Sequence, residues 1–305
     1  MNISLKRREI MINGVINVYK EPGYTSFDVV ARLRKIFRQK KIGHTGTLDP
    51  NASGVLPVCL GNATKVCDML TDKDKTYVTV MQLGIATDTQ DITGNIIERA
   101  DVNINPSLVK SVAESFIGEY MQIPPMYSAL KVNGKKLYEL AREGVTVERK
   151  ARPVTIYDIK IKDITLPYVT MEVSCSKGTY IRTLCDDIGR RLGCFGCVKE
   201  LTRTYAAGFR IENSLKLDEI EKLVVTGDIK KHIVELPCLF DDCGMIVLKP
   251  FADRLAYNGN KIVQSDIDYI NTVENKDYRL YASTKTFVGI YKKCDGEYKP
   301  VKMFL

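Results

Sequence analysis

The segment from residue 43 to residue 57 places a lone carboxylate, Asp49, where no regular helix can form. It contains three glycines, two prolines and one of the two histidines of the chain. Pro50 pushes the backbone of Asp49 toward the extended region, which fixes the direction in which the carboxylate leaves the chain. A solvated Asp-Pro turn is the alternative, but the density of conformational constraint favours a shaped loop that presents Asp49 for chemistry.

Positive charge leads directly into this loop. An expected helix over residues 26 to 37 can be capped by Thr25 or Ser26 and carries apolar residues at helical spacing. Six lysines and arginines lie on its outer side and beyond its end, between Arg32 and Lys41. A solvated face and a phosphate-binding surface explain such a run equally well. Because the run ends at the loop, we interpret it as a phosphate-binding surface beside a site.

Three further side chains stand at the ends of expected strands, where they could join the loop carboxylate. Tyr77 begins a strand over residues 76 to 83 that is rich in β-forming residues. Tyr180 and Arg182 follow a glycine at which a strand turns into a helix. A tyrosine in such a place is more often part of the core, and such an arginine more often forms a surface ion pair. The residues alone leave these alternatives open.

Size and composition indicate a fully folded protein with an anionic partner. The 305 residues are 45% hydrophobic and 27% charged, within the ordinary range of globular proteins. The formal charge is +8 and the sequence pI is about 8.9. No run of about 18 apolar residues occurs, and residues 1 to 12 lack an apolar core. We therefore expect no membrane span, no secretory signal and a cytoplasmic location.

The cysteine pattern argues against a disulfide framework and against a metal site. Nine cysteines are scattered along the chain, whereas disulfide frameworks are dense and even-numbered in short secreted sequences. Cys194 and Cys197 have CxxC spacing, but neither a second such pair nor paired histidines complete a zinc set. We expect free, mostly buried thiols and no metal.

The character of the expected elements changes along the chain. Residues 154 to 166 and 168 to 176 alternate as two strands that should be neighbours in a sheet. Residues 124 to 152 combine an Asn-Gly turn with aromatic and basic side chains, which favours contact with RNA over a solvated excursion. Beyond about residue 236, short β-rich runs replace the longer helices and predict a separate small β domain.

Six stretches of the chain resemble, in order, the motifs of the TruB family, the bacterial tRNA pseudouridine-55 synthases. They are residues 20–26, 44–57, 73–77, 87–91, 124–142 and 176–182. The resemblance implies an α+β pseudouridine synthase fold with a mixed, largely antiparallel central sheet and flanking helices. It implies a catalytic domain over residues 1–235, with an insertion at about 124–152 that clasps the T-loop. Residues 236–305 would form a β-rich, PUA-like RNA-binding domain on the acceptor-stem side of tRNA.

The implied reaction converts uridine 55 in the T-loop of tRNA to pseudouridine without a metal or an organic cofactor. The uracil leaves the ribose, rotates and reattaches through carbon, which needs one carboxylate at the sugar rather than a pair. Asp49 matches the essential aspartate of the family, which acts either as a nucleophile on the sugar or as a base at the neighbouring carbon. By the same resemblance Arg182 would pair with Asp49 and keep it ionised. Tyr77 would stack on the uracil, Tyr180 would hold the network of the site, and Leu201 would line the pocket.

The resemblance also assigns residues that bind the RNA. A base inside a folded loop must be extruded, which costs a few kcal/mol of stacking. The ring of His44 would fill the place that the base vacates, whereas a structural hydrogen bond in the loop is the alternative. Lys20, in the first matching stretch, is expected to bind substrate.

Two rival functions share these residues. A non-catalytic tRNA-binding or tRNA-folding module would bind tRNA without forming pseudouridine, and the intact set of site residues speaks against it. A pseudouridine synthase that acts on another RNA would use the same chemistry. A nucleoside hydrolase, which would release free uracil, fits less well. Nothing in the sequence demands a dimer, and we expect a monomer.

Overall fold

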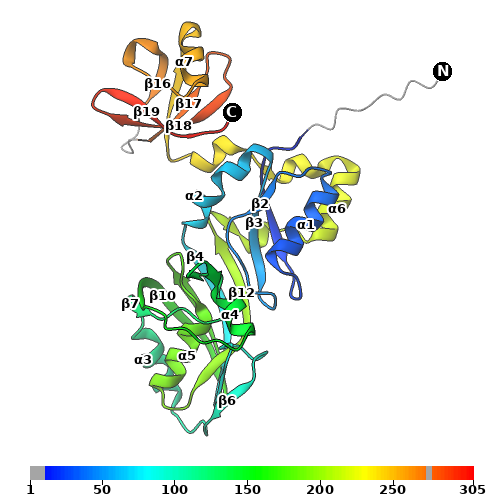
Figure 1. The fold of residues 1–305 in the computed structure, drawn as a ribbon, viewed down its shortest axis with the longest axis vertical. Helices are drawn as coiled ribbons and strands as arrows, with labels where there is room; N and C mark the ends of the chain where they lie inside the picture. Colours follow the sequence, from blue (N-terminus) through cyan, green and yellow to red (C-terminus); the bar gives the residue numbers. More distant parts are fainter. Residues whose placement is uncertain (1–10, 273–276) are drawn as a thin grey trace, which may run out of the picture.

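The computed structural model describes residues 11–272 and 277–305. Figure 1 shows a main body of sheet and helices with a smaller β-rich domain at its upper end. In the part of the chain that the structure describes, no helix is both long and apolar enough to cross a membrane.

A ten-stranded sheet forms the main body. Its path runs through β14 (Ile233–Val234), β1 (Gly14–Lys20), β3 (Ser53–Leu60), β12 (Gly196–Ala206), β4 (Lys75–Leu83), β11 (Tyr168–Cys175), β10 (Arg152–Thr165) and β7 (Gly118–Gln122), with β2 (Ile42–His44) beside β3 and β13 (Phe209–Arg210) beside β12. Strands β3 and β12 run parallel, and the other neighbouring pairs of this sheet are antiparallel. The expected mixed, largely antiparallel sheet is therefore confirmed.

The burial of the strands explains their sequence patterns. All eight residues of β3 are buried, because the strand lies inside the sheet and is covered on both faces. In β4, buried and half-buried residues alternate along the whole strand, as in a sheet with one face toward the core. The start of β4 therefore carries Tyr77 on the core side of the sheet, beside the parallel contact of β3 and β12.

The helices cover the sheet at two places. Helix α1 (Ser26–Ile36) begins at a capping box of Thr25 and Asp28 and packs against α6 (Leu217–Thr226). Helix α5 (Ile181–Arg191) lies against β12, and α3 (Pro106–Glu114) lies against β10. The remaining helical turns of the main body are η1 (Gly61–Val66), α2 (Cys67–Thr71), α4 (Leu137–Arg142), η2 (Ile211–Asn213) and η3 (Asp228–His232).

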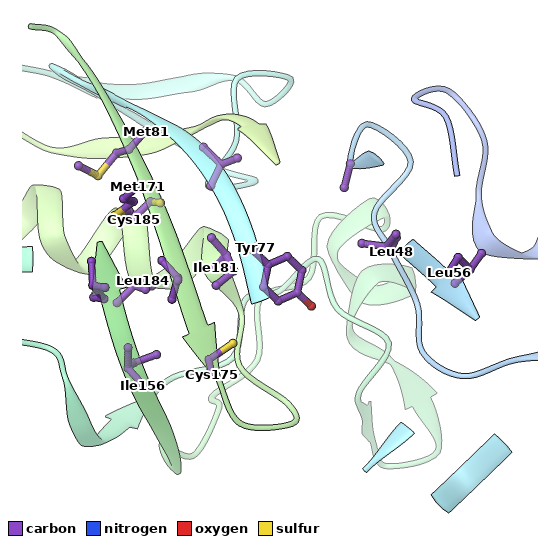
Figure 2. Close-up of a cluster of buried hydrophobic side chains, with 14 of the residues drawn as sticks. Leu48, Leu56, Tyr77, Met81, Ile156, Met171, Cys175, Ile181, Leu184 and Cys185 are labelled. Carbon is purple, nitrogen blue, oxygen red and sulfur yellow. The ribbon is translucent and has the colours of Figure 1, made fainter. Parts of the chain in front are cut away.

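One large apolar core lies between the sheet and these helices. Figure 2 shows the part of it around the start of β4. Met81 and Leu184 lie on one side of Tyr77 in this view, and Leu48 and Leu56 lie on the other. The tyrosine thus belongs to the core, while its hydroxyl group points away from the group around Met81.

Two small hairpins extend from the main body. Strand β5 (Ile85–Thr87) pairs with β6 (Ile96–Arg99), and β8 (Lys131–Val132) pairs with β9 (Lys135–Lys136). The predicted Asn-Gly turn joins β8 to β9, with positive φ at both Asn133 (51°) and Gly134 (84°). A two-residue turn of this kind matches the twist of a hairpin and favours asparagine followed by glycine.

A C-terminal β-rich domain follows, as expected. It contains a five-stranded sheet in the order β16 (Ile267–Asn271), β15 (Gly244–Leu248), β17 (Asp277–Tyr281), β18 (Phe287–Cys294) and β19 (Glu297–Met303). Its helical turns are η4 (Leu236–Phe240), η5 (Pro250–Ala252), α7 (Asp253–Tyr257) and η6 (Gln264–Asp266). A separate apolar cluster, with Phe240 and Phe304 against Val15, Ala63 and Val66, joins this domain to the main body.

Several elements differ in their bounds from the sequence prediction. Asn62 or Thr64 predicts the start of a short helix that ends at about residue 70, and the structure instead has a 3-10 turn over Gly61–Val66 that continues as α2. The sequence predicts a basic helix over residues 135–142 that ends at Gly144, but α4 begins only at Leu137, because Lys135 and Lys136 pair with β8. Residues 198–207, which the sequence pattern does not assign to a strand, lie largely in β12, because they pair along the length of β4.

Candidate active site

The loop that carries Asp49 is fixed by hydrogen bonds on both sides of the carboxylate. Leu48 N donates to Ser26 Oγ (3.0 Å), and Ala52 N donates to Asp49 O (3.1 Å). At Gly54, where β3 begins, φ is +102° and a Cβ would lie 2.2 Å from Arg203 O. Only glycine lets β12 approach so closely, and this approach holds the end of the loop.

Asp49 forms a two-point ion pair with Arg182, at the start of α5. Arg182 Nε lies 2.9 Å from Asp49 Oδ2, and Nη2 donates to Oδ1 (3.2 Å). The arginine side chain is 6% exposed, whereas the aspartate side chain is 40% exposed. The pair therefore presents an oriented carboxylate to the outside while the cation stays beneath it.

The guanidinium of Arg182 is itself held by the backbone. Nη1 donates to Thr89 O (3.0 Å) and Nη2 donates to Tyr127 O (2.7 Å). Asp91 Oδ2 lies 4.0 Å from Nη1 and adds a second negative charge. Segments far apart in the sequence thus fix one side chain, and that side chain fixes Asp49.

Tyr180 is placed by a buried glutamine at the end of β7. Gln122 is fully buried, its Oε1 accepts from Tyr180 N (2.8 Å), and its Nε2 donates to Tyr180 O (3.0 Å). The guanidinium of Arg152 lies 5.4 Å from the centre of the Tyr180 ring. Tyr180 precedes the first residue of α5, so Gln122 fixes the point at which the helix begins and Arg182 emerges.

Tyr77 lies beside a buried arginine, Arg203, on the neighbouring strand. Tyr77 and Arg203 are directly opposite in the register of β4 and β12. Burial raises the pKa of the Tyr77 phenol, while the adjacent guanidinium of Arg203 acts in the opposite direction. Arg203 is 1% exposed, and its guanidinium donates to Val55 O (2.8 Å) and Gly46 O (3.5 Å). Arg203 therefore connects the Tyr77 strand to the Asp49 loop.

Lys20 is enclosed at the end of β1 and bonded to the backbone. Its Nζ donates to Tyr24 O (2.6 Å), Pro50 O (2.9 Å) and Glu21 O (3.2 Å). Burial lowers the pKa of Lys20 to about 8, partly opposed by the charge of Asp49. These contacts are all with the backbone of the protein itself, and the substrate contact expected from the sequence stays a prediction. The ammonium is completely covered and holds the chain next to Asp49.

His44 lies at the end of β2, on the edge of an open hollow of about 510 Å3. Its Nδ1 accepts a hydrogen bond from Gly46 N (3.3 Å). Burial, and then the charge of Arg203, lowers the pKa of His44, so the ring is neutral at pH 7. The hollow is also lined by aromatic, basic and sulfur-containing side chains, including Phe27, Arg34, Lys40, Lys41 and Cys67.

The basic run before the loop divides into two parts in the structure. Arg32 pairs with Asp218 (2.5 Å) and Glu221 (3.3 Å) of α6. The exposed side chains of Arg34 and Lys41 turn instead to the hollow beside His44. Within the run, α6 thus supplies counter-charges to Arg32, whereas Arg34, Lys40 and Lys41 line the hollow with exposed side chains. Phosphate binding by this run stays a prediction.

Some site residues were not singled out from the sequence. Arg203 stands two residues after Leu201, which is half-buried against the main core, so the two positions share one face of β12. That spacing was a usable signal for Arg203. Gln122 gave no signal, because its role depends on the pairing of distant elements. Asp91 lies in one of the six stretches that resemble TruB motifs, but the sequence predicted no role for it.

The nine cysteines are all free thiols, and six of them are buried, as expected. The described residues contain no group of three or more His, Cys, Asp or Glu side chains that could hold a metal ion.

Comparisons with known proteins give the family. Residues 34–181 match the model of the TruB family pseudouridylate synthase N-terminal domain, and residues 182–236 match that of the tRNA pseudouridylate synthase B C-terminal domain. A protein named tRNA pseudouridine synthase B from Lachnoclostridium phytofermentans is 52% identical over 96% of this chain and 100% of its own length. Its namesake from Clostridium novyi is 45% identical with the same coverage.

Solved structures agree with the sequence relatives. A crystal structure of a Cbf5-Nop10-Gar1 complex contains a chain that is 27% identical, with a TM-score of 0.72, over 96% of this chain and 85% of that one. An H/ACA RNP bound to a substrate RNA containing 2'-deoxyuridine contains another, 25% identical with a TM-score of 0.71 over the same shares. Both the full-length relatives and the shared fold lead to one conclusion: the chain belongs to the TruB family of pseudouridylate synthases.

Proposed function

We propose that this protein isomerises uridine 55 in the T-loop of tRNA to pseudouridine, with Asp49 as the essential catalytic group. The observation that carries the proposal is the Asp49–Arg182 pair, in which a buried, immobilised cation orients a carboxylate that remains accessible. Near-full-length relatives are named tRNA pseudouridine synthase B, which supports a tRNA substrate and this class of reaction. The TruB family supplies the reaction, and this pair supplies the group that performs it.

The reaction moves one bond and one proton. The bond between C1' of the ribose and N1 of uracil breaks, and a bond between C1' and C5 forms after the base turns. The proton on C5 is then released, and N1 takes up a proton. Asp49 serves this sequence either as a nucleophile at the sugar or as a base at the neighbouring carbon. Its two-point contact with Arg182 orients it for either role.

Tyr77, Tyr180 and Leu201 form the surroundings of the uracil in this proposal. The Tyr77 ring stacks on the base, and its phenol stays protonated because burial raises its pKa. Tyr180 holds the network at the start of α5, and Leu201 supplies an apolar wall. Base flipping completes the arrangement: the neutral ring of His44 enters the T-loop in place of the extruded uracil.

Other parts of the chain hold the rest of the tRNA. We propose that residues 124–152 clasp the T-loop and that residues 236–305 form a PUA-like domain on the acceptor-stem side. Residues 1–235 then form the catalytic domain. The separate apolar cluster within the C-terminal sheet supports this division. The protein needs no metal or organic cofactor for this reaction and acts as a monomer in the cytoplasm.

The test is release of tritium from C5-labelled uridine in a T-loop hairpin. Asp49→Asn keeps the size of the side chain but removes its charge, so we expect tritium release to fall at least about 10³-fold. Asp268→Asn, at an exposed carboxylate on β16, is the matched control and should release tritium normally. Normal release by Asp49→Asn would sink the mechanism. Equal turnover of ribosomal RNA fragments and the T-loop hairpin would contradict the assignment of the substrate.

A further inference from the structure

Two thiols meet on one face of the β2–β3 hairpin, next to the hollow at His44. Gly43 and Cys59 are directly opposite in the antiparallel register, so their side-chain positions share a face. A Cβ built on Gly43 would lie 3.3 Å from Cys67 Sγ. Cys67, at the start of α2, also packs against the apolar cluster to which Cys59 belongs. The absence of a side chain at residue 43 thus leaves the space in which the two sulfurs approach each other.

The two thiols differ in access to solvent. Cys59 is fully buried, whereas Cys67 is half-buried and lines the hollow. A hydrogen bond from the Cys59 thiol lowers the pKa of Cys67. An oxidant that enters the hollow therefore meets the more reactive sulfur first, with a second thiol beside it that can resolve the product.

From this arrangement we propose that Cys59 and Cys67 are a modification site, a thiol pair that forms a reversible disulfide with a peroxide as oxidant. The Cys67 thiolate attacks one peroxide oxygen, the O–O bond breaks, and water and a Cys67 sulfenic acid result. The Cys59 thiol then displaces the hydroxyl group from the Cys67 sulfur and releases a second water. Two thiols are oxidised, one peroxide is reduced to two waters, and a dithiol reverses the bond.

The disulfide changes the hollow because it needs the two sulfurs about 2.05 Å apart. Cys67 must move from its place over Gly43 toward β3, and the short helix α2 moves with it. Gly43 is the residue before His44, which is the proposed base-displacing residue. This consequence rests on the proposed function: oxidation should weaken binding of a T-loop hairpin several-fold, and reduction should restore it.

The test uses the full-length protein, first reduced and then freed of reductant. The protein is treated with hydrogen peroxide, alkylated, digested with trypsin and analysed by mass spectrometry without reduction. Cleavage after Lys65 separates the two cysteines. We expect one cross-linked peptide pair, two hydrogen atoms lighter than its parts, that dithiothreitol separates. Cys238, which is exposed, reports the strength of the oxidant in the same sample.

The proposal would be overturned if Cys238 were oxidised while Cys59 and Cys67 were both recovered as alkylated thiols. A sulfinic acid at Cys67 without a cross-link would also overturn it. In Cys59→Ser, the sulfenic acid at Cys67 should accumulate and react with dimedone. Cys238→Ser should retain the cross-link. A cross-link without any change in hairpin binding would overturn the consequence for RNA. An active Asp49→Asn variant would instead overturn the proposed function, and the peptide measurement is independent of it.

Discussion

Lysine and arginine side chains surround both Asp49 and the hollow at His44, but they are held differently in the two regions. Near Asp49, the buried residues Lys20, Arg182 and Arg203 each donate to backbone carbonyl oxygens. At the hollow, the basic side chains are exposed. A buried cation that is bonded to the backbone fixes geometry, whereas an exposed cation is available for phosphate. The first region should therefore control kcat and the second should control KM.

The strongest test of this comparison is Arg182→Lys. A lysine keeps the charge but cannot contact both oxygens of Asp49 and the carbonyls of Thr89 and Tyr127 together. We expect kcat for the T-loop hairpin to fall about 10²-fold or more, with little change in KM. Single-turnover kinetics with saturating enzyme would measure this effect.

The matched control for Arg182→Lys is Arg190→Lys on the same helix. Arg190 is half-exposed and pairs with Asp186 one turn earlier. Its replacement should leave both kinetic constants unchanged. Thermal melting would show whether either variant is folded. A change in KM alone in folded Arg182→Lys would mean that the buried cation does not orient Asp49 for chemistry.

A smaller effect should come from Lys20 as a function of pH. The pKa of Lys20 is lowered to about 8, so the ammonium loses its proton as pH rises through that value. The neutral amine holds Pro50 O less strongly and no longer attracts Asp49, and kcat should fall up to about tenfold between pH 7 and 9. Single-turnover rates across this range would reveal an alkaline limb with an apparent pKa near 8.

Stability should change in the opposite direction. Between pH 8 and 10.5 the unfolded chain still holds the Lys20 proton that the folded protein has lost. The unfolded state then binds more protons, so the contribution of Lys20 to the free energy of unfolding rises with pH. In folded Lys20→Arg, whose guanidinium does not titrate in this range, both trends should disappear. An alkaline limb that persists in this variant would assign the titration to another group.

The sequence predicted most strands and helices and, through the family resemblance, the Asp49–Arg182 contact. It did not predict the residues that hold this contact in place. Local patterns define the strand that starts near Tyr77 and the helix that follows Tyr180. The placing of Arg203 depends instead on the parallel register of β12 with β3, in which Arg203 lies opposite Gly54. This register pairs residues about 150 positions apart in the sequence. Hydrophobic periodicity predicts the strands themselves but not which distant strands pair. The sequence pattern does not show such distant partners.

The burial of the Lys20 side chain is a second feature that the sequence pattern does not show. Its place in the first matching stretch suggested a substrate contact, and lysine is seldom fully buried in proteins. Folding supplies three carbonyl oxygens around its ammonium and makes burial possible. The roles of Lys20, His44, Tyr77, Tyr180 and Leu201 toward substrate stay predictions, as does the division of the chain at residue 235.

The smallest expected effect comes from the exposed region, through Lys41→Gln. Lys41 borders the hollow and contacts Asn62 Oδ1 (3.2 Å), so its loss should not disturb the core. If Lys41 binds a phosphate, tRNA affinity should fall modestly, and the slope of log affinity against log salt should decrease by about one. Lys110→Gln, at an exposed position on α3, should leave the slope unchanged. An unchanged slope in Lys41→Gln, or a fall in kcat at saturating tRNA, would contradict the separation of a binding region from a chemical one. A reduced slope with an unchanged kcat would place phosphate binding beside His44, outside the bonded network that fixes Asp49.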